Sequence, residues 1–371
     1  MGRTGLAHLP LHGGKAPKWL FTRMVALSKS IIEVMLLELG PDAVLLRLSD
    51  PYWFQALSCV LGYDWHSSGT TTVTCGALKE AIDPETHGIA FCGGKGTASK
   101  HALDDIVSAC SCFNFSTDTI DIFRYASRMT AKIDSAAIQD NYSLYHHMFF
   151  FSEKKKWAVI QQGMNTENKY ARRYHWSSEN LENFLREPHQ GIFSSKKQEI
   201  TLDMTARMSK VSQKISVDLI NDNPYHLRTC FAQMKLPSTQ VTLDALSSVN
   251  IQTKTMKTLD MPRFINWQKL RELYEFQPRN YEELLACRGL GPSTVRALAL
   301  VSDLIYGEPP SWVDPVKYSF TVGGKDGVPF PVDRKAMDET IACISQGIQD
   351  AVLGNNEKMY AIRRLSTLIP N

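Results

Sequence analysis

The chain has 371 residues, of which 43% are hydrophobic, and its formal net charge at pH 7 is +3. This length supports a sizeable core and about two domains. No stretch reaches the ~18 consecutive apolar residues that a membrane helix needs, so we expect no membrane partner. The opening residues lack the apolar segment of a secretory signal, so we expect a cytoplasmic protein with reduced cysteines.

The first part of the chain, residues 1–236, mixes helical and strand patterns and predicts an α+β domain. Apolar residues at helical spacing predict a helix over 18–39, and Asp50 followed by Pro51 predicts a second, capped helix. Residues 70–74 fit either a strand or the entry to a helix. Four later segments carry local signals: a strand running into a glycine turn over 88–96, a hairpin over 143–164, a serine-capped helix over 177–185, and an amphipathic helix over 207–222.

Short helices dominate from about Val241, and we place there an all-α second domain over 241–350, followed by a tail over 351–371. The boundary is a Leu236-Pro237 step before a stretch rich in serine and threonine. Within this domain, the pattern over 280–307 predicts two helices joined by a short glycine turn. The fold class that we expect is therefore a mixed helix and sheet domain followed by a helical domain.

The segment CRGLGPSTVRALALV, residues 287–301, places two glycines around one leucine at the start of a helix. Glycine permits positive φ and has no Cβ, Leu290 can insert between the two helices, and Pro292 suits a first helical turn. Asn280 is placed to cap the preceding helix. Such a turn directs free backbone N–H groups outward, which makes an anion site suited to a nucleic-acid phosphate.

This segment resembles the helix-hairpin-helix DNA-binding motif. The resemblance implies contact with the phosphate backbone that does not depend on base sequence. Where the motif often has Lys or Arg after the second glycine and proline, this chain has Ser293, whose hydroxyl gives a weaker contact. The residues that the resemblance assigns to DNA binding are Gly289, Leu290, Gly291, Pro292, Ser293, Thr294 and Arg296.

Two other interpretations of the same segment stay open. A tight hairpin of two helices can be purely structural and needs no ligand. Base-excision glycosylases with such a hairpin carry a catalytic Asp shortly after it, and Asp314 stands in a comparable place, although no cysteine cluster or catalytic Lys follows Gly291. Asp314-Pro315 is also an ordinary turn signal.

Most of the chain resembles an archaeal and bacterial family, the domain-of-unknown-function family 763. The motifs that carry the resemblance are RTGLAHLPLHGGKAPKWLF, VLGYDWHSSGTTT, YHHMFFFSEKKKWAVIQQGMN, YARRYHW and DGVPFPVDRK. The resemblance implies a shared fold and an archaeal-type host, and it assigns no activity. A hypothesis about chemistry therefore has to come from the polar residues themselves.

Polar residues of the first domain suggest a metal-dependent phosphodiesterase. Nine of the ten histidines precede residue 190. Asp64 and His66 would share one face of an extended strand, a spacing suited to a metal or to an acid-oriented imidazole. Such enzymes commonly combine an acid, a polar residue on the next strand and a cation that holds phosphate. The other catalytic candidates that supply these groups are Asp134, Gln161, Arg172 and His175.

The cofactor that this set implies is a divalent metal such as Mg or Mn. Asp134 is also suited to a salt bridge with Lys132, and Asp64 to a polar turn. We expect a nucleoid-associated protein of DNA repair or processing that binds DNA in preference to RNA and acts as a nuclease if its first domain holds metal. Two alternatives stay open: a non-catalytic accessory protein that binds nucleic acid, and an enzyme acting on a small phosphorylated molecule.

Overall fold

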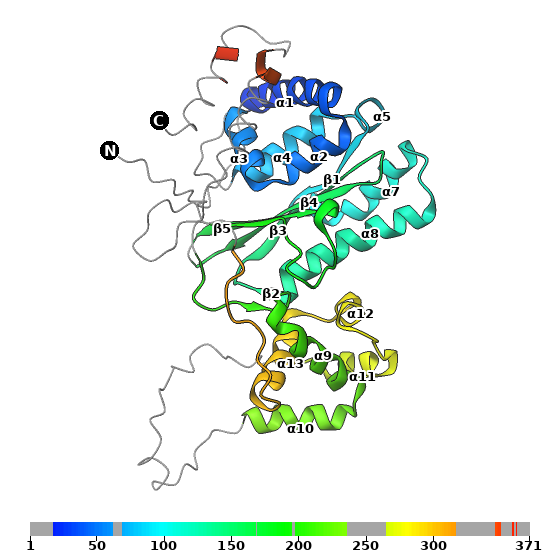
Figure 1. The fold of residues 1–371 in the computed structure, drawn as a ribbon, viewed down its shortest axis with the longest axis vertical. Coiled ribbons are helices and arrows are strands. Elements are labelled where there is room, and N and C mark those ends of the chain that lie inside the picture. The colour runs from blue at the N-terminus through cyan, green and yellow to red at the C-terminus, as the bar shows by residue number, and fades with distance from the viewer. Residues whose placement is uncertain are drawn as a thin grey trace, which may run out of the picture.

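The structure, a computed structural model, describes residues 18–61, 69–167, 169–194, 197–235, 265–316, 346–349, 358–359 and 361. It mixes helix and sheet, as the sequence predicts, with an upper body built around one sheet and a lower body made of helices (Figure 1). Within these ranges no helix combines the length and the apolar character that crossing a membrane requires.

The centre of the upper body is a five-stranded antiparallel sheet in the order β1-β3-β4-β5-β6. Its strands are β1 (Ile89–Lys95), β3 (Ser143–Ser152), β4 (Trp157–Asn165), β5 (Tyr170–Ser177) and β6 (Gly191–Ser194). Successive side chains of a strand point to opposite faces, so each strand contributes to two packing layers. The central strands β4 and β5 are buried along most of their length, which requires a cover on both faces.

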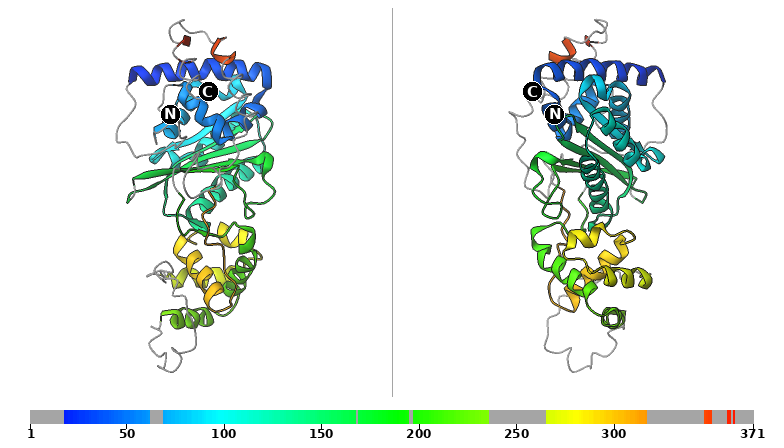
Figure 2. Two further views of the ribbon diagram at one scale, coloured as in Figure 1. Left: turned by 60° about the vertical axis from the view of Figure 1, so that its left-hand side comes forward. Right: turned by 90° about the vertical axis from the view of Figure 1, so that its right-hand side faces the viewer.

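Four helices cover one face of the sheet, as Figures 1 and 2 show from three directions. They are α1 (Lys18–Leu39), α2 (Pro41–Ser49), α3 (Pro51–Val60) and α4 (Gly69–Ala81). Their apolar side chains pack against sheet residues such as Phe150 and Ile160. The predicted cap is confirmed, because the Asp50 carboxylate accepts hydrogen bonds from Tyr52 N and Trp53 N, both at 2.8 Å.

Helices α7 (Ala102–Cys112) and α8 (Thr117–Lys132) cover the opposite face. Ile106 and Phe123 from these helices pack against Phe149 and Phe151 of β3. The remaining short elements of this region are α5 (Pro84–His87), α6 (Thr97–Lys100), a π-helical turn Ile133–Ala137 after α8, and the pair β2 (Ile138–Gln139) and β7 (Leu202–Asp203). The sheet is thus covered by one layer of helices on each face.

The lower body consists of helices that follow the sheet in the sequence. They are α9 (Lys210–Asn221), α10 (Pro224–Lys235), α11 (Trp267–Phe276), α12 (Tyr281–Ala286) and α13 (Pro292–Leu304). It is attached to α8 by polar contacts: Tyr125 Oη donates to Glu282 at 2.7 Å, and the Lys132 ammonium donates to the carbonyl oxygen of Leu290. One buried apolar cluster continues from the α8 face of the sheet into these helices.

Most of the locally predicted elements are confirmed. The helix over 18–39 coincides with α1, the hairpin over 143–164 forms β3 and β4, and the segment 70–74 lies inside α4. The predicted helix over 177–185 is wrong, because only a 3-10 turn forms at Ser178–Asn180. The chain then follows an irregular path that buries Leu185 and places Phe184 beside Trp176, so core packing overrides the local helix signal.

Two segments lie elsewhere than the sequence predicts. Helices α9 and α10, which we assigned to the first domain, pack against α11, α12 and α13 in the lower body. Residues 346–349, which we assigned to the second domain, return to the upper body, where Ile348 is buried in the same cluster as Ile31 of α1. The segment 236–264, which contains the predicted boundary, lies outside the described residues, and independent folding of the two bodies stays a prediction.

Candidate functional site

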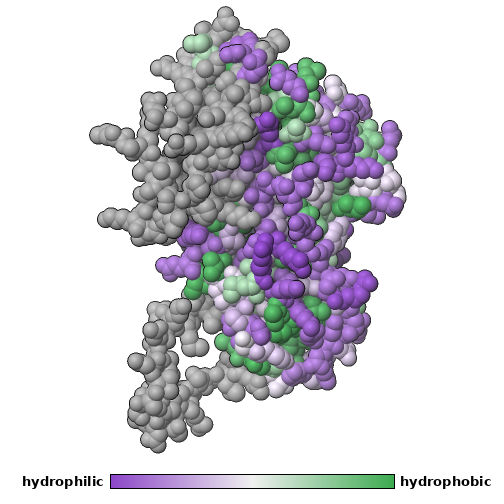
Figure 3. Space-filling model, viewed as in Figure 1, coloured by the Kyte–Doolittle hydropathy of each residue, from purple (hydrophilic) through white to green (hydrophobic). Residues whose placement is uncertain are grey.

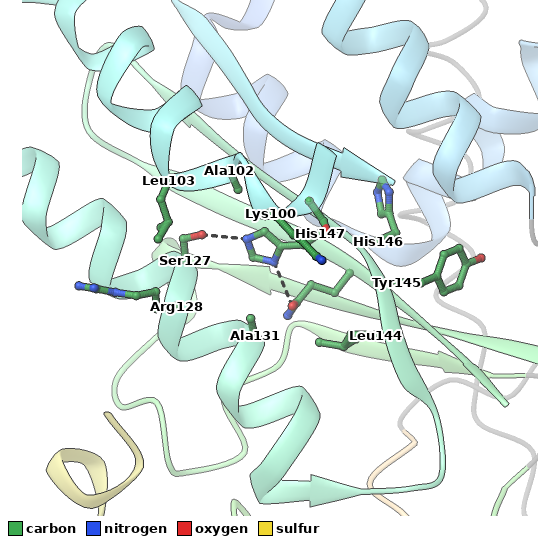
Figure 4. A pocket seen from close by; sticks show the side chains of 12 residues that line it. Lys100, Ala102, Leu103, Ser127, Arg128, Ala131, Leu144, Tyr145, His146 and His147 are labelled. Carbon is green, nitrogen blue, oxygen red and sulfur yellow. Dashed lines mark hydrogen bonds between the residues drawn. The ribbon is translucent and has the colours of Figure 1, made fainter. Parts of the chain in front are cut away.

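A pocket of about 240 Å³ lies between α6, the start of α7, α8 and the start of β3. Twelve side chains line it, and Figure 4 shows ten of them with labels. Ser127, His147 and Gln161 form its polar group, and Lys100 adds a positive charge. Arg128 also lines it but extends away from the His147 ring in Figure 4. This pocket is the place where the structure gathers polar groups beside open space.

His147 on β3 is held between Ser127 and Gln161 (Figure 4). Its Nε2 lies 2.8 Å from Ser127 Oγ, and its Nδ1 lies 3.0 Å from Gln161 Oε1. The Gln161 amide donates through Nε2 to Asp134 Oδ2 at 2.6 Å, which turns its Oε1, an acceptor only, toward His147. Nδ1 therefore carries the imidazole proton, and the Ser127 hydroxyl donates to the lone pair of Nε2.

The environment of His147 favours its neutral form. Burial lowers the pKa of His147 below the ordinary 6.5, and the hydrogen bond from Nδ1 to Gln161 opposes this only in part. A neutral imidazole whose free nitrogen faces a hydroxyl can accept the hydroxyl proton. The pair of Ser127 and His147 is thus chemically able to generate a nucleophilic oxygen.

Asp134 accepts hydrogen bonds on both carboxylate oxygens. The donors are Gln161 Nε2 at 2.6 Å, Trp176 Nε1 at 2.9 Å and His189 Nε2 at 2.5 Å. Because both of its oxygens already accept hydrogen bonds, Asp134 is better suited to orient Gln161 than to bind a metal ion. Across the described part of the chain, no three His, Cys, Asp or Glu side chains gather in a way that could hold a metal ion. The Mg or Mn hypothesis therefore depends on residues beyond those described.

Arg172 lies on the same face of the sheet as Gln161, but in a separate network. Its guanidinium donates to Asp140 at 2.9 Å and to both oxygens of Asp314 at 3.0 and 2.7 Å, and Tyr174 Oη also donates to Asp140. Burial lowers the pKa of Arg172, but the two carboxylates outweigh burial and raise it, so the guanidinium stays charged. Asp314, compared above with a glycosylase acid, is here a buried partner of Arg172.

The opposite face of the sheet carries its own polar group. Arg173 is fully buried and donates to Gln55 at 3.0 Å and to Thr71 at 3.4 Å. Its guanidinium carbon lies between two rings, 4.9 Å from the centroid of Phe54 and 4.7 Å from that of Phe193. Among the described residues no carboxylate forms an ion pair with Arg173. Its direct contacts within the described residues are therefore neutral oxygens and aromatic rings, and Asp50 adds an electrostatic attraction without an ion pair.

His175, a predicted catalytic residue, also lies on this opposite face. Its Nδ1 donates to the carbonyl oxygen of Ser49 at 2.9 Å, and its ring makes an edge contact with Phe54. Burial, followed by the charge of Arg173, lowers the pKa of His175 well below 6.5. His146 of β3 lies on the same face and is buried with no hydrogen-bond partner on either ring nitrogen within the described residues, and burial lowers its pKa to about 3.

The structure thus brings together part of the predicted catalytic set. Asp134 and Gln161 are hydrogen-bonded, Arg172 shares their face in another network, and His175 lies across the sheet. Asp64 and His66 lie outside the described residues. The four described members do not converge on one place, because three of them have buried partners and the fourth faces the other layer, and their catalytic role stays a prediction.

The hairpin turn has much of the predicted geometry. Asn280 caps α12 by accepting from Glu283 N at 2.9 Å, and Leu290 is buried with 1% exposure. Gly289 has φ of +88°, as expected, whereas Gly291 has φ of −111° and serves as the N-cap of α13. A Cβ built on Gly291 would meet no heavy atom of the described residues within 4 Å. Gly291 therefore leaves the start of α13 open.

The side chains around the turn differ in their exposure. Arg288, Gly289, Pro292 and Ser293 are exposed, whereas Thr294 is buried with 7% exposure. This arrangement leaves the hydroxyl of Ser293, rather than that of Thr294, on the surface.

Further back from the turn, Arg296 donates to Gln139 at 3.5 Å and lies over the ring of Trp312 at 5.5 Å. We call the segment Arg288–Ser293, in which Leu290 is the buried residue, the hairpin surface.

Ser127 and His147 are functional candidates that our sequence analysis missed. A signal for His147 existed, because the predicted hairpin places it opposite Gln161, and the observed register pairs these two residues. Ser127 had no such signal, because its position beside His147 results from the packing of α8 on the sheet. A serine in the middle of an amphipathic helix looks the same in sequence whether or not a base faces it.

The fold and these sites define an α+β protein with a central antiparallel sheet and a helical lower body. A family model described as "protein of unknown function (DUF763)" matches residues 5–332. The chain belongs to this family, as its motifs indicated. Neither the curated proteins nor the solved structures with which the chain was compared gave a match.

Proposed function

We propose that the protein binds the phosphate backbone of DNA through the hairpin surface. The observation that supports this most directly is the open start of α13, where a Cβ on Gly291 would meet no described atom within 4 Å. The first N–H groups of a helix have no partner within the helix and lie at the positive end of its dipole. In α13, Pro292 has no N–H group, and Thr294 N and Val295 N both donate to Gly291 O at 3.1 Å, so a phosphate oxygen would bind the N–H of Ser293.

The neighbouring side chains fit a contact of this kind. Arg288 supplies an exposed positive charge at the turn, and Ser293 supplies a hydroxyl. The coloured part of the face in Figure 3 is largely hydrophilic, with its hydrophobic residues scattered in small groups. Contacts of this type position a protein on the backbone and read no base sequence. The proposal therefore concerns sequence-independent binding, as expected for repair or processing of DNA in the nucleoid.

The Gly291→Val variant tests this proposal. A valine side chain would enter open space, so the fold should be unaffected, and it would fill the volume that a phosphate oxygen needs. Losing one or two hydrogen bonds to a charged group costs about 1.5–3 kcal/mol each, so affinity should fall at least about tenfold. Fluorescence anisotropy with labelled single- and double-stranded DNA, and with RNA of the same sequence, measures this at several salt concentrations.

The matched control is Thr117→Val, which changes the exposed first residue of another helix, α8. Wild type and control should bind with an affinity that falls steeply with salt, because counterions are released from the backbone. Equal DNA affinity of Gly291→Val and wild type, with both folded, would refute the role of the hairpin surface. Tighter binding of RNA than of DNA would change the partner that we propose.

Metal-dependent cleavage is a separate part of the proposal. The same reactions with Mg²⁺ or Mn²⁺, analysed on a gel, distinguish a nuclease from an accessory protein that only binds. The Asp64→Ala and His66→Ala variants should abolish cleavage and leave binding intact if these residues hold the metal. Binding without any product would favour the accessory protein.

A further inference from the structure

The pair of Ser127 and His147 is not used by the nucleic-acid proposal, and it opens on a pocket. We propose that Ser127 is the nucleophile of a second, hydrolytic site that cleaves small carboxylic esters bearing a negative charge. The site is separate from the hairpin surface, because its residues come from α6, α7, α8, the π-helical turn, β3 and β4 of the upper body.

The hydrogen bond of Ser127 distinguishes it from three other helical serines. Ser58, Ser111 and Ser216 donate to the carbonyl oxygen one helical turn earlier, at 2.8, 3.0 and 2.8 Å. That bond satisfies a hydroxyl within its own helix and makes it inert. Ser127, also inside a helix, is hydrogen-bonded instead to the ring of His147 on another element. Its oxygen is therefore directed at a base and not at its own backbone.

Gln161 and Asp134 form a chain of hydrogen bonds that starts at His147 Nδ1. Gln161 fixes the imidazole with its proton on Nδ1, and Asp134 fixes the orientation of Gln161. When Nε2 takes up a proton, the resulting imidazolium still donates from Nδ1 to the Gln161 carbonyl oxygen, which the buried carboxylate polarises. Gln161 and Asp134 are positioning residues in this scheme, whereas Ser127 and His147 act on the substrate.

In this proposal, the donors for the oxygen that becomes negative during the reaction come from the start of α7, which borders the same pocket. Ala102 and Leu103, the first two residues of α7, line it, and the first N–H groups of a helix have no intrahelical partner. Such N–H groups stabilise the oxyanion of a tetrahedral intermediate. The pocket thus combines a nucleophile, a base and donors for an oxyanion.

The reaction balances without any cofactor. Ser127 Oγ forms a bond to the ester carbonyl carbon while its proton passes to His147 Nε2. The bond from that carbon to the leaving oxygen then breaks, and the alcohol departs with the proton from His147. Water, deprotonated by His147, attacks the acyl group, and the bond to Oγ breaks as Ser127 regains its proton. The sum is ester plus water giving acid plus alcohol.

The walls of the pocket define the substrate class. Leu103, Ala131 and Leu144 supply apolar contacts, and the volume of about 240 Å³ admits only a small acyl group. Lys100 lines the same space and favours a substrate with a carboxylate at some distance from the reacting carbon. A half-ester of a short dicarboxylic acid has this combination of size and charge.

The first experiment uses the folded full chain and phenylmethanesulfonyl fluoride, a small reagent that modifies activated serines. Mass spectrometry of the intact protein and of its peptides should find one adduct, on Ser127. The exposed Ser135, just after α8, is an internal control that should stay unmodified. This measurement needs no variant, so a folding defect cannot obscure it. Absence of an adduct on Ser127, or equal modification of Ser135, would overturn the proposal.

The second experiment compares 4-nitrophenyl acetate with the 4-nitrophenyl half-ester of succinic acid. The half-ester should be hydrolysed faster, and Lys100→Met should remove that preference. Ser127→Ala should abolish turnover, whereas Ser135→Ala should keep it. Turnover that survives in folded Ser127→Ala, or a Lys100→Met variant that keeps the preference, would contradict the nucleophile or the substrate class respectively.

A third measurement, the pH dependence of the rate of serine modification, distinguishes a positioning role of Gln161 from a role in folding alone. The rate of serine modification in wild type should persist below pH 6.5, because the base stays neutral there. Gln161→Leu should reduce this rate about 100-fold while the protein remains folded, since the imidazole loses its fixed tautomer. An unchanged rate and pH profile in that variant would show that Gln161 has no positioning role. DNA affinity of Ser127→Ala should equal that of wild type, so the two proposals fail or succeed separately.

Discussion

Arg172 and Arg173 are adjacent in the chain and both fully buried, yet the protein compensates their charges by different means. Arg172 faces the α8 layer and is held by two carboxylates, those of Asp140 and Asp314. Arg173 faces the α3 and α4 layer and is held by neutral oxygens and two aromatic rings. One step along a strand thus moves a guanidinium from an ionic to a largely neutral environment.

Burial alone therefore does not determine how the charge of an arginine is compensated. An ion pair in the interior is strongly interdependent, because removing one member strands the other. A guanidinium held by neutral groups leaves no opposite charge behind when it is removed. The same substitution at Arg172 and at Arg173 therefore compares the loss of an ion pair with the loss of neutral hydrogen bonds. The two positions are adjacent on β5.

Arg172→Met should have the largest effect. It leaves Asp140 and Asp314 buried without their shared cation, which costs about 3–5 kcal/mol of unfolding free energy. Urea denaturation followed by circular dichroism measures the change. A loss below about 1 kcal/mol would mean that the two carboxylates find other compensation, and the contrast with Arg173 would disappear.

Acid should destabilise the protein through three buried histidines. Burial lowers the pKa of His146, His147 and His175 below the ordinary 6.5, so the folded state stays neutral where the unfolded chain binds protons. Stability should therefore be insensitive to these groups above about pH 6.5 and fall below it. The slope is about 1.4 kcal/mol per pH unit for each histidine that remains neutral.

Urea denaturation curves at several pH values between 7.5 and 5 would measure this slope. Each histidine that stays neutral in the folded state should contribute ~1.4 kcal/mol of unfolding free energy per pH unit. Replacing each histidine singly by Phe shows which residue contributes. A flat profile down to pH 5 would show that the histidines take up protons in the folded state.

Arg173→Met should cost less than Arg172→Met, about 1–3 kcal/mol, because it removes hydrogen bonds but breaks no ion pair with a described carboxylate. It should also make the protein less sensitive to acid, since Arg173 is one cause of the lowered pKa of His175. The same urea series at pH 7.5 and 5.5 measures both effects. Equal losses for the two arginines would refute the proposed difference in compensation.

The smallest effect is expected at the surface. Lys156 and Glu179 form an ion pair at 2.7 Å, with side chains about half exposed at 44% and 50%. Glu179→Gln should leave the urea midpoint close to that of wild type, because water screens exposed charges. If Glu179→Gln lowered the unfolding free energy as much as Arg172→Met does, the strength of an ion pair in this protein would not depend on its burial.

Local features of the fold could be predicted from the sequence. The spacing over 18–39 indicated α1, the Asp50 cap was recognisable, and the glycine and proline of the turn indicated the break before α13. These signals depend on neighbours in the chain, and local backbone preference is enough to produce them. The incorrect helix over 177–185 shows the limit, because Leu185 and Phe184 are drawn into a core formed by distant strands.

The candidate sites were less predictable for the same reason. Asp134 and Gln161 were recognised as polar residues of interest, but their partnership with His147 and Ser127 requires α8 to lie on β3 and β4. Asp314 offers a second example, since its pairing with Arg172 spans 142 positions of the chain. Spacing in the sequence cannot reveal contacts that only tertiary packing creates.

The return of the chain to α1 has a mechanical consequence. Ile348 is buried in the same cluster as Ile31, so described segments near the two ends of the chain are fastened together in the upper body. A pulling force applied to segments near those ends would be borne first by this contact and would bypass the lower body. The helices that carry the hairpin surface would thus be shielded from tension until the contact at α1 gives way.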